Sequence, residues 1–186
     1  MIRTLIGGVG YRWMRDASFG LVVSDMLARE RWPGEVEIAD LGYGALYVTL
    51  DLLDKQPSLD RLVLIAATVR DRPPGTLSCT RYRPELAPTD EVQARVREAG
   101  AGVIDLDHLL AIAQHFGALP NEIVCLELEP VDASGGTELT DVAAMQLPRA
   151  GALARQLALG EVSLHDLDRA VAATCVAAPD GASIWR

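Results

Sequence analysis

Short apolar runs alternate with segments of helical periodicity along most of the chain. Five of these runs have the length and the aliphatic content of buried strands. They are TLIGGV (4–9), EVEIAD (35–40), RLVLIAAT (61–68), GTLSCTRY (75–82) and EIVCLELEP (122–130). Strands that alternate with helices favour a mostly parallel sheet with helices on both faces. The pattern therefore predicts an α/β fold.

Five helical segments are predicted between and after these runs. They cover about 19–27, 44–54 and 106–116, with one more from about Thr140 and one that starts at a capping box of Ser163 and Asp166. In the first segment, apolar residues recur every three or four positions and share one face. Pro148 is expected to kink or interrupt the fourth, because proline lacks an N–H and clashes with the preceding turn. The tail at about 177–186 reads as irregular.

Length and composition predict one globular domain over residues 1–186. The chain is 49% hydrophobic and 23% charged, which is ordinary for a packed core. It has neither a signal-peptide pattern nor an apolar run long enough to span a bilayer, so a cytoplasmic location without a membrane partner is predicted. Cys79, Cys125 and Cys175 are far apart and odd in number, which favours buried thiols in a reducing compartment over disulfides.

The charge balance argues against nucleic acid as a partner. Seventeen basic and 26 acidic residues give a net charge of -9, which repels a phosphate backbone unless basic side chains gather on one face. Arg70, Arg72, Arg81 and Arg83 do lie close together in the sequence. We interpret them as a solvated loop and an exposed strand edge, because so short a basic cluster mostly serves solubility.

The glycine turn after the first strand is the first candidate for a binding site. Gly8-Val9-Gly10 begins like a dinucleotide-binding fingerprint, but its third glycine position holds Trp13. A tight structural turn is therefore the favoured interpretation, and a nucleotide-binding or small-molecule enzyme is the weakest alternative. No nucleophile elbow or P-loop lysine is present, and His108, His115 and His165 are interpreted as surface histidines.

The order of several longer pieces resembles a known family. The pieces are GVGYRWMRDASFG, VEIADLGYG, DRLVLIAAT, PPGTL, LDHLLAIAQHFGALP and LELEPVDASGGTELTDVAAMQLPRA. Together, over about residues 2–158, they resemble the hydrogenase maturation endopeptidases, which trim the C-terminal extension of the nickel-iron hydrogenase large subunit after nickel insertion. The resemblance implies a three-layer α/β/α sandwich around a twisted, mostly parallel five-stranded sheet. It also implies a cleft where a Glu or Asp, an Asp and a His meet the substrate's nickel.

The chain departs from this family at the ligand positions. Matching the motifs places Ala17, Ala66 and Gly102 where the three ligands are expected, and Tyr11 replaces an asparagine. None of the three side chains has a donor atom, so no metal site is predicted by the family pattern. By resemblance, the substrate cleft contains Gly10, Tyr11, Asp16, Ala17, Asp40, Gly42, Ala66 and Gly102.

Two hypotheses follow from these departures. The first is a degenerate, non-catalytic member without a cofactor, which serves as a chaperone, scaffold or regulator and binds the hydrogenase large subunit or another maturation factor. The second is an active endopeptidase that contacts the substrate's nickel through substitute groups, with Asp16, Asp40 and His108 as candidates. Adjacent positions point in different directions, so substitution would need a rebuilt cleft.

Three further aspartates are possible substitute groups. Asp71, Asp105 and Asp107 also lie near the expected ligand positions. Whether Trp13, Trp32 and Trp185 are core or interface residues does not follow from the pattern.

Overall fold

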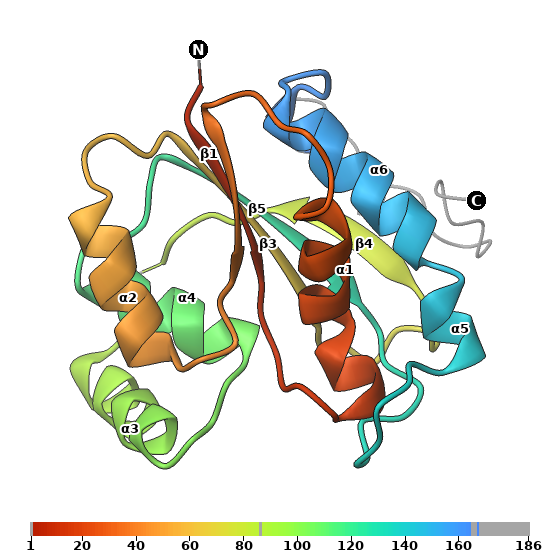
Figure 1. Ribbon diagram of the computed structural model, residues 1–186. Coiled ribbons are helices and arrows are strands. Elements are labelled where there is room, and N and C mark those ends of the chain that lie inside the picture. Colours follow the sequence, from red (N-terminus) through yellow and green to blue (C-terminus); the bar gives the residue numbers. More distant parts are fainter. Residues whose placement is uncertain (1, 86, 165–166, 168–186) are drawn as a thin grey trace, which may run out of the picture.

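A five-stranded sheet forms the centre of the protein. The computed structural model describes residues 2–85, 87–164 and 167. Its strands are β1 (Thr4–Gly8), β2 (Val36–Asp40), β3 (Arg61–Ala67), β4 (Leu77–Arg81) and β5 (Glu122–Leu128). Their order in the sheet is β2-β1-β3-β5-β4, and β4 runs antiparallel to β5 while the other pairs are parallel (Figure 1). All five predicted strands are confirmed.

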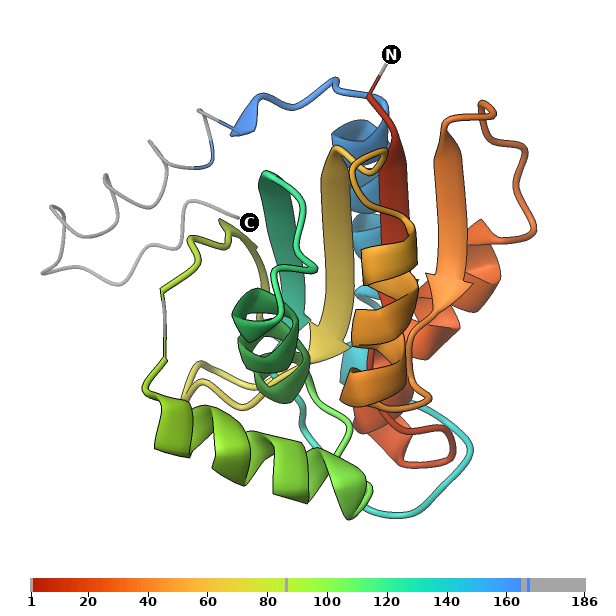
Figure 2. The same cartoon turned by 90° about the vertical axis from the view of Figure 1, so that its left-hand side faces the viewer.

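Helices cover both faces of this sheet, as the resemblance implied. One face carries α1 (Phe19–Leu27), α5 (Asp141–Ala144) and α6 (Leu147–Ala158), and the other carries α2 (Ala45–Asp54) and α4 (Leu106–His115) (Figures 1 and 2). A further helix, α3 (Thr89–Gly100), packs mainly on α4, and a short 3-10 helix, η1 (Arg15–Ser18), precedes α1. The α/β/α sandwich is thus confirmed.

The central strands are apolar on both sides because each face packs on helices. Leu62 and Leu64 of β3 join the core under α2 and α4, whereas Val63 and Ile65 join the core under α1 and α6. Every residue of β3 from Arg61 to Ala66 is buried. A strand buried on both faces needs a continuous rather than an alternating apolar sequence, which is why RLVLIAAT was readable as a strand.

The ends of the helices follow local chemistry. Asp105 caps α4 by accepting a hydrogen bond from the backbone N–H of His108 at 2.8 Å. Gly117 has a φ of 69° after the end of α4, as expected for a left-handed cap. The segment from Thr140 is interrupted as predicted: α5 ends at Ala144, and Pro148 lies in the first turn of α6. The remainder of the segment that starts at Ser163, with its partner Asp166, and the tail lie outside the described residues.

One helix was missed by the sequence analysis, whereas the two cysteines described agree with it. The α3 helix was not predicted, because it is polar and buries only Val92. Cys79 and Cys125 are free thiols, partly buried and buried respectively, as predicted. Burial raises the pKa of the Cys79 thiol to about 12 and also raises that of Cys125, so neither is primed as a nucleophile. Cys175 lies outside the described residues.

No helix in the described part of the chain is long and apolar enough to cross a membrane.

The glycines of the β1–α1 turn are required for close packing. A Cβ at Gly20 would lie 2.0 Å from the carbonyl oxygen of Ile65, and one at Gly10 would lie 2.1 Å from that of Ala17. At Gly8 it would lie 2.3 Å from the carbonyl oxygen of Gly20. Protein backbone therefore fills the space beside these glycines, which supports the interpretation of GVG as a structural turn.

We expect Gly20→Ala to destabilise the protein by about 1–3 kcal/mol, because the methyl group would press on the backbone of β3. Gly100→Ala is the matched control, since nothing lies within 4 Å of a Cβ at that position. Alanine should be neutral there or stabilise the end of α3 by up to about 1 kcal/mol. Urea unfolding measures both changes, and equal stability of the two variants would contradict this packing account.

Candidate functional site

The predicted cleft lies at the carboxyl edge of the sheet, where loops after parallel strands gather. This edge is the lower one in Figure 2, where the arrowheads of β2 and β3 point down. Ala66 is a buried residue of β3, Ala17 lies in η1, and Gly102 lies between α3 and α4 with a φ of 100°. All three expected ligand positions therefore belong to segments at or next to this edge.

Asp16 is fully buried and holds the loop that follows β5. Its carboxylate accepts hydrogen bonds from the backbone N–H groups of Val131 (2.9 Å), Asp132 (3.2 Å) and Thr140 (2.8 Å). The hydroxyl of Thr140 donates a fourth bond at 2.9 Å. A buried carboxylate needs such donors to offset its lost hydration. Asp16 therefore stabilises the loop that follows β5 against the segment before α1.

Tyr11 joins the β1–α1 turn to the segment before α4. Its hydroxyl donates to the carbonyl oxygen of Gly102 at 3.2 Å and accepts from the backbone N–H of Ile104 at 2.7 Å. The structure thus brings together Tyr11 and Gly102, two residues that the sequence assigned to one cleft. The phenol hydroxyl thus both donates and accepts a hydrogen bond, and Tyr11 links the β1–α1 turn to the segment between α3 and α4.

Asp40, at the end of β2, is paired with Arg12. The Arg12 guanidinium donates to Asp40 at 2.7 and 3.2 Å and to Asp25 at 2.8 and 3.1 Å. The other carboxylate oxygen of Asp40 accepts from the backbone N–H of Gly42 at 2.7 Å. Hydrogen bonds from Arg12 lower the pKa of Asp25 and so keep that carboxyl ionised. Asp40 therefore faces a cation of the protein itself.

His108 is not the solvated surface residue that the sequence suggested. Its side chain is only 12% exposed and lies between Asp105, at 2.8 Å from Nδ1, and Glu98, at 2.7 Å from Nε2. The sequence analysis missed this contact because Glu98 belongs to α3, the helix that was not predicted. His115 is exposed, as expected, and His165 lies outside the described residues.

A network around Arg70 is the main feature that sequence reasoning missed. Arg70 donates two hydrogen bonds to Asp107 at 2.8 and 2.7 Å and pairs with Glu127 at 3.1 Å. Arg72 also pairs with Glu127, at 3.3 Å. Glu129 accepts the backbone N–H of Arg70 at 2.8 Å. The interpretation of Arg70 and Arg72 as solvated loop residues is thus wrong, because acidic groups of β5 and α4 face them.

This network lies beside an expected ligand position. Glu127 of β5 is the register partner of Ala66 in β3, and its side chain is only 8% exposed. Burial of a lone carboxylate is costly, and the two guanidinium groups offset that cost. Hydrogen bonds from Arg70 also lower the pKa of Asp107. The sequence signal for this network was Glu127 and Glu129, which follow the apolar run 123–126; Glu129 lies just after β5.

The described residues contain no group of three His, Cys, Asp or Glu side chains that could hold a metal ion. The substitute candidates Asp16, Asp40 and His108 do not form such a group, and each is hydrogen-bonded to different partners. Each of these three side chains is engaged in hydrogen bonds within the protein.

The tryptophans have different surroundings. Trp13, in the β1–α1 turn, is 70% exposed at the carboxyl edge. Trp32 is partly buried, donates its indole N–H to the carbonyl oxygen of Leu27 at 2.8 Å, and has the Arg155 guanidinium 4.8 Å from its ring centroid. Trp185 lies outside the described residues. Of the two tryptophans described, Trp13 is the more exposed.

We expect Asp16→Asn to destabilise the protein by about 2–4 kcal/mol, because the amide NH2 would face backbone N–H groups that need an acceptor. Asp71→Asn is the control, since Asp71 is exposed and its φ of 57° is one that asparagine tolerates. That change should cost less than about 0.5 kcal/mol. Chemical unfolding distinguishes the two, and a neutral Asp16→Asn would remove the structural role.

His108 should make stability depend on pH. Burial lowers its pKa, but hydrogen bonds to Glu98 and Asp105 outweigh this and raise the pKa overall, against a small opposing effect of Arg95. Because the pKa is raised on folding, protonated His108 stabilises the folded state. This stabilisation is complete below the unfolded-state pKa of about 6.5 and is lost as pH rises through the folded-state pKa. Compared with His108→Gln, the natural chain should lose up to about 1 kcal/mol as pH rises from below about 6.5 through the folded-state pKa.

The control for that measurement is His115→Gln, which removes an exposed histidine. This variant keeps the contact of His108 with Glu98 and Asp105, so it should retain the loss of stability with rising pH that His108→Gln removes. If His108→Gln instead showed the same pH dependence as the natural chain, the bridge between α3 and α4 would not contribute.

Comparison with known proteins places the fold and the motifs in one family. The family model described as hydrogenase maturation protease matches residues 21–157. No curated protein matches the chain. Among solved structures, the hydrogenase 2 maturation peptidase from Thaumarchaeota archaeon SCGC_AB-539-E09 is 30% identical, with a TM-score of 0.60 and coverage of 85% of this chain and 98% of that one.

Two further structures support the fold. The hydrogenase maturating endopeptidase HybD from E. coli is 23% identical, with a TM-score of 0.65 and coverage of 86% of this chain and 93% of that one. The [NiFe] hydrogenase maturation protease HybD from Thermococcus kodakarensis is 19% identical, with a TM-score of 0.59 and coverage of 84% and 99%. With a family match over most of its length, this chain belongs to the hydrogenase maturation protease family.

Proposed function

We propose that this chain is a non-catalytic member of its family that binds the nickel-iron hydrogenase large subunit, or another maturation factor, without cleaving it. Its part in maturation would be that of a chaperone, scaffold or regulator in the cytoplasm. The protein would need no cofactor of its own, and nickel would enter the site only as part of the bound partner.

The observation that carries the proposal is the set of residues at the expected ligand positions. Ala17 and Ala66 offer methyl groups and Gly102 offers a hydrogen atom, and none of these can coordinate a metal. Divalent first-row metals bind through imidazole, carboxylate and thiolate groups. A partner's nickel would therefore lack its usual contacts, and polarisation of a scissile carbonyl by a shared metal would fail.

The Arg70 network supports the same conclusion. Glu127, the register partner of Ala66, and Asp107 are the acidic groups of this network that could take over as ligands, yet both are engaged by Arg70. A guanidinium stays protonated at any physiological pH, so it would repel an incoming nickel ion. Recruiting either carboxylate would require breaking a bidentate pair and leaving charge uncompensated.

Exposed apolar side chains at the carboxyl edge support a retained binding role. Trp13 and Met145 are each 70% exposed, and Val69 is 69% exposed. They come from the β1–α1 turn, the segment after β3 and the residue that follows α5. We call Trp13, Val69 and Met145 the edge patch. Aromatic and methionine side chains are enriched in protein interfaces, so this edge suits a protein partner.

The test combines binding with cleavage, using the full chain and a nickel-loaded large-subunit precursor. We expect a complex by calorimetry and a precursor whose mass is unchanged after incubation. Met145→Asp should weaken binding roughly tenfold or more, because it places a charge in the interface. Phe116→Asp is the matched control, as Phe116 is 52% exposed at the other end of the fold, after α4.

Release of the C-terminal peptide, seen by mass spectrometry, would overturn the non-catalytic role and favour the endopeptidase with substitute contacts. Absence of binding, or equal binding by the Met145→Asp and Phe116→Asp variants, would overturn the edge patch as the docking surface.

A further inference from the structure

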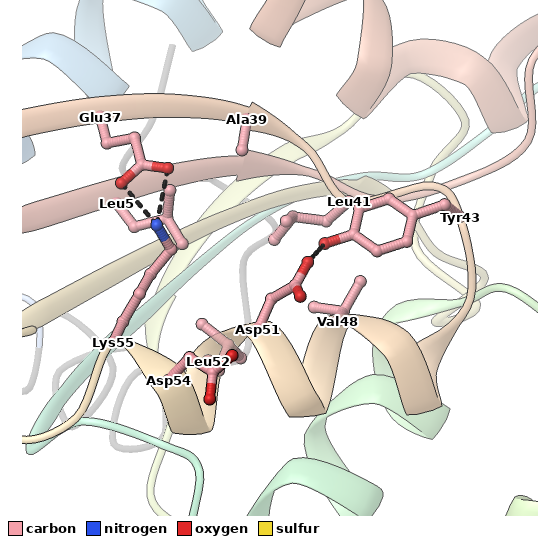
Figure 3. Close-up of a pocket in the computed structure, with 10 residues that line it drawn as sticks. All are labelled: Leu5, Glu37, Ala39, Leu41, Tyr43, Val48, Asp51, Leu52, Asp54 and Lys55. Atoms are coloured by element: carbon pink, nitrogen blue, oxygen red, sulfur yellow. Dashed lines mark hydrogen bonds and ion pairs between the residues drawn. The ribbon is translucent and has the colours of Figure 1, made fainter.

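A groove between α2 and the edge strand β2 is separate from the three expected ligand positions. It encloses a cavity of about 280 Å³. Figure 3 shows side chains of β2 pointing toward those of α2 across this space. We call it the α2–β2 groove, and its lining residues are Leu5, Glu37, Ala39, Leu41, Tyr43, Val48, Asp51, Leu52, Asp54 and Lys55.

The groove exists because Ala39 is small. Its floor and walls are apolar, with Leu5, Leu41, Val48 and Leu52 all buried. Ala39 projects only a methyl group from β2 toward α2, where a larger side chain would fill the space (Figure 3). The lining suits an aliphatic chain, because moving CH2 groups from water to an apolar surface is favourable.

Polar bridges limit the groove at both ends. Nζ of Lys55 bonds to both carboxylate oxygens of Glu37, at 2.8 and 2.7 Å, and the hydroxyl of Tyr43 donates to Asp51 (Figure 3). Figure 3 marks no hydrogen bond or ion pair between the Asp54 side chain and the other residues that line the groove. The rim therefore has three carboxylates against one ammonium, and it favours a cation.

The strand beside the groove has a free edge. β2 is the outermost strand on its side of the sheet, and among the described residues its only strand partner is β1. An extended peptide can add to such an edge through backbone hydrogen bonds. A residue opposite Ala39 on an added strand would have its Cβ about 5 Å away and would point to the same face. Its side chain would therefore lie over the groove.

We propose that the α2–β2 groove docks an extended segment of a partner protein that inserts a lysine side chain. The aliphatic stem lies on Leu41, Val48 and Leu52, and the ammonium reaches the carboxylates of the rim. The backbone of the segment pairs with β2. This docking does not depend on the proposed function, because it uses neither the edge patch nor the expected ligand positions.

The probe is the peptide acetyl-Thr-Val-Lys-Val-Thr-amide, titrated into the full chain and followed by NMR. Binding should shift the methyl signals of Leu5, Leu41, Val48 and Leu52 together with the backbone amides of β2. A peptide with glutamate in place of lysine should bind about tenfold more weakly or worse, and the affinity of the lysine peptide should fall with added salt.

Two variants locate the site. Ala39→Leu should abolish the methyl shifts by filling the cavity, with the thermal midpoint as a check of folding. Asp54→Asn should weaken binding roughly two- to fivefold, as expected for one exposed ion pair. Asp90→Asn removes the same charge from the exposed first turn of α3, and it should bind like the natural chain.

Three results would overturn the proposal. The first is equal binding of the lysine and glutamate peptides, and the second is unchanged binding by the Ala39→Leu and Asp54→Asn variants. The third is that hexylamine alone binds as tightly as the lysine peptide while the β2 amides do not shift under either. That result would assign the groove to a free amine instead of a protein segment.

Discussion

The buried carboxylate of Asp16 organises the functional edge of the molecule. It lies one residue before an expected ligand position, and its four hydrogen bonds reach Val131, Asp132 and Thr140. A charge buried without donors would cost several kcal/mol, so the loop after β5 and the β1–α1 turn are fixed together. That coupling fixes the start of α5, because two of the four hydrogen bonds come from Thr140, the residue before this helix.

Contacts within the protein join the segments that meet at the carboxyl edge. Tyr11 joins the first turn to the Gly102 segment, and Arg70 joins the end of β3 to α4 and β5. Both contacts lie within the chain. The binding role proposed for this edge rests on these contacts and on Ala17, Ala66 and Gly102, whose side chains carry no donor atom.

Much of the fold was accessible from the sequence, because a sheet buried on both faces demands long apolar runs such as the one in β3. The division of the helical segment from Thr140 into α5 and α6 was also accessible, because the effect of Pro148 on a helix is local. The α3 helix was not, since only Val92 is buried and its apolar pattern is correspondingly weak. The Arg70 network and the burial of His108 depend on contacts between segments that are distant in the sequence. The pattern of residues within one segment cannot predict such contacts.

The central claim is that the cleft no longer provides a place for nickel. Calorimetric titration of the full chain with nickel sulfate, and with zinc and cadmium for comparison, tests it most directly. The account predicts no binding in the micromolar range. Micromolar binding of one nickel ion per chain that is lost in His108→Gln, while that variant remains folded, would contradict it and show that a substitute site has been built at this edge.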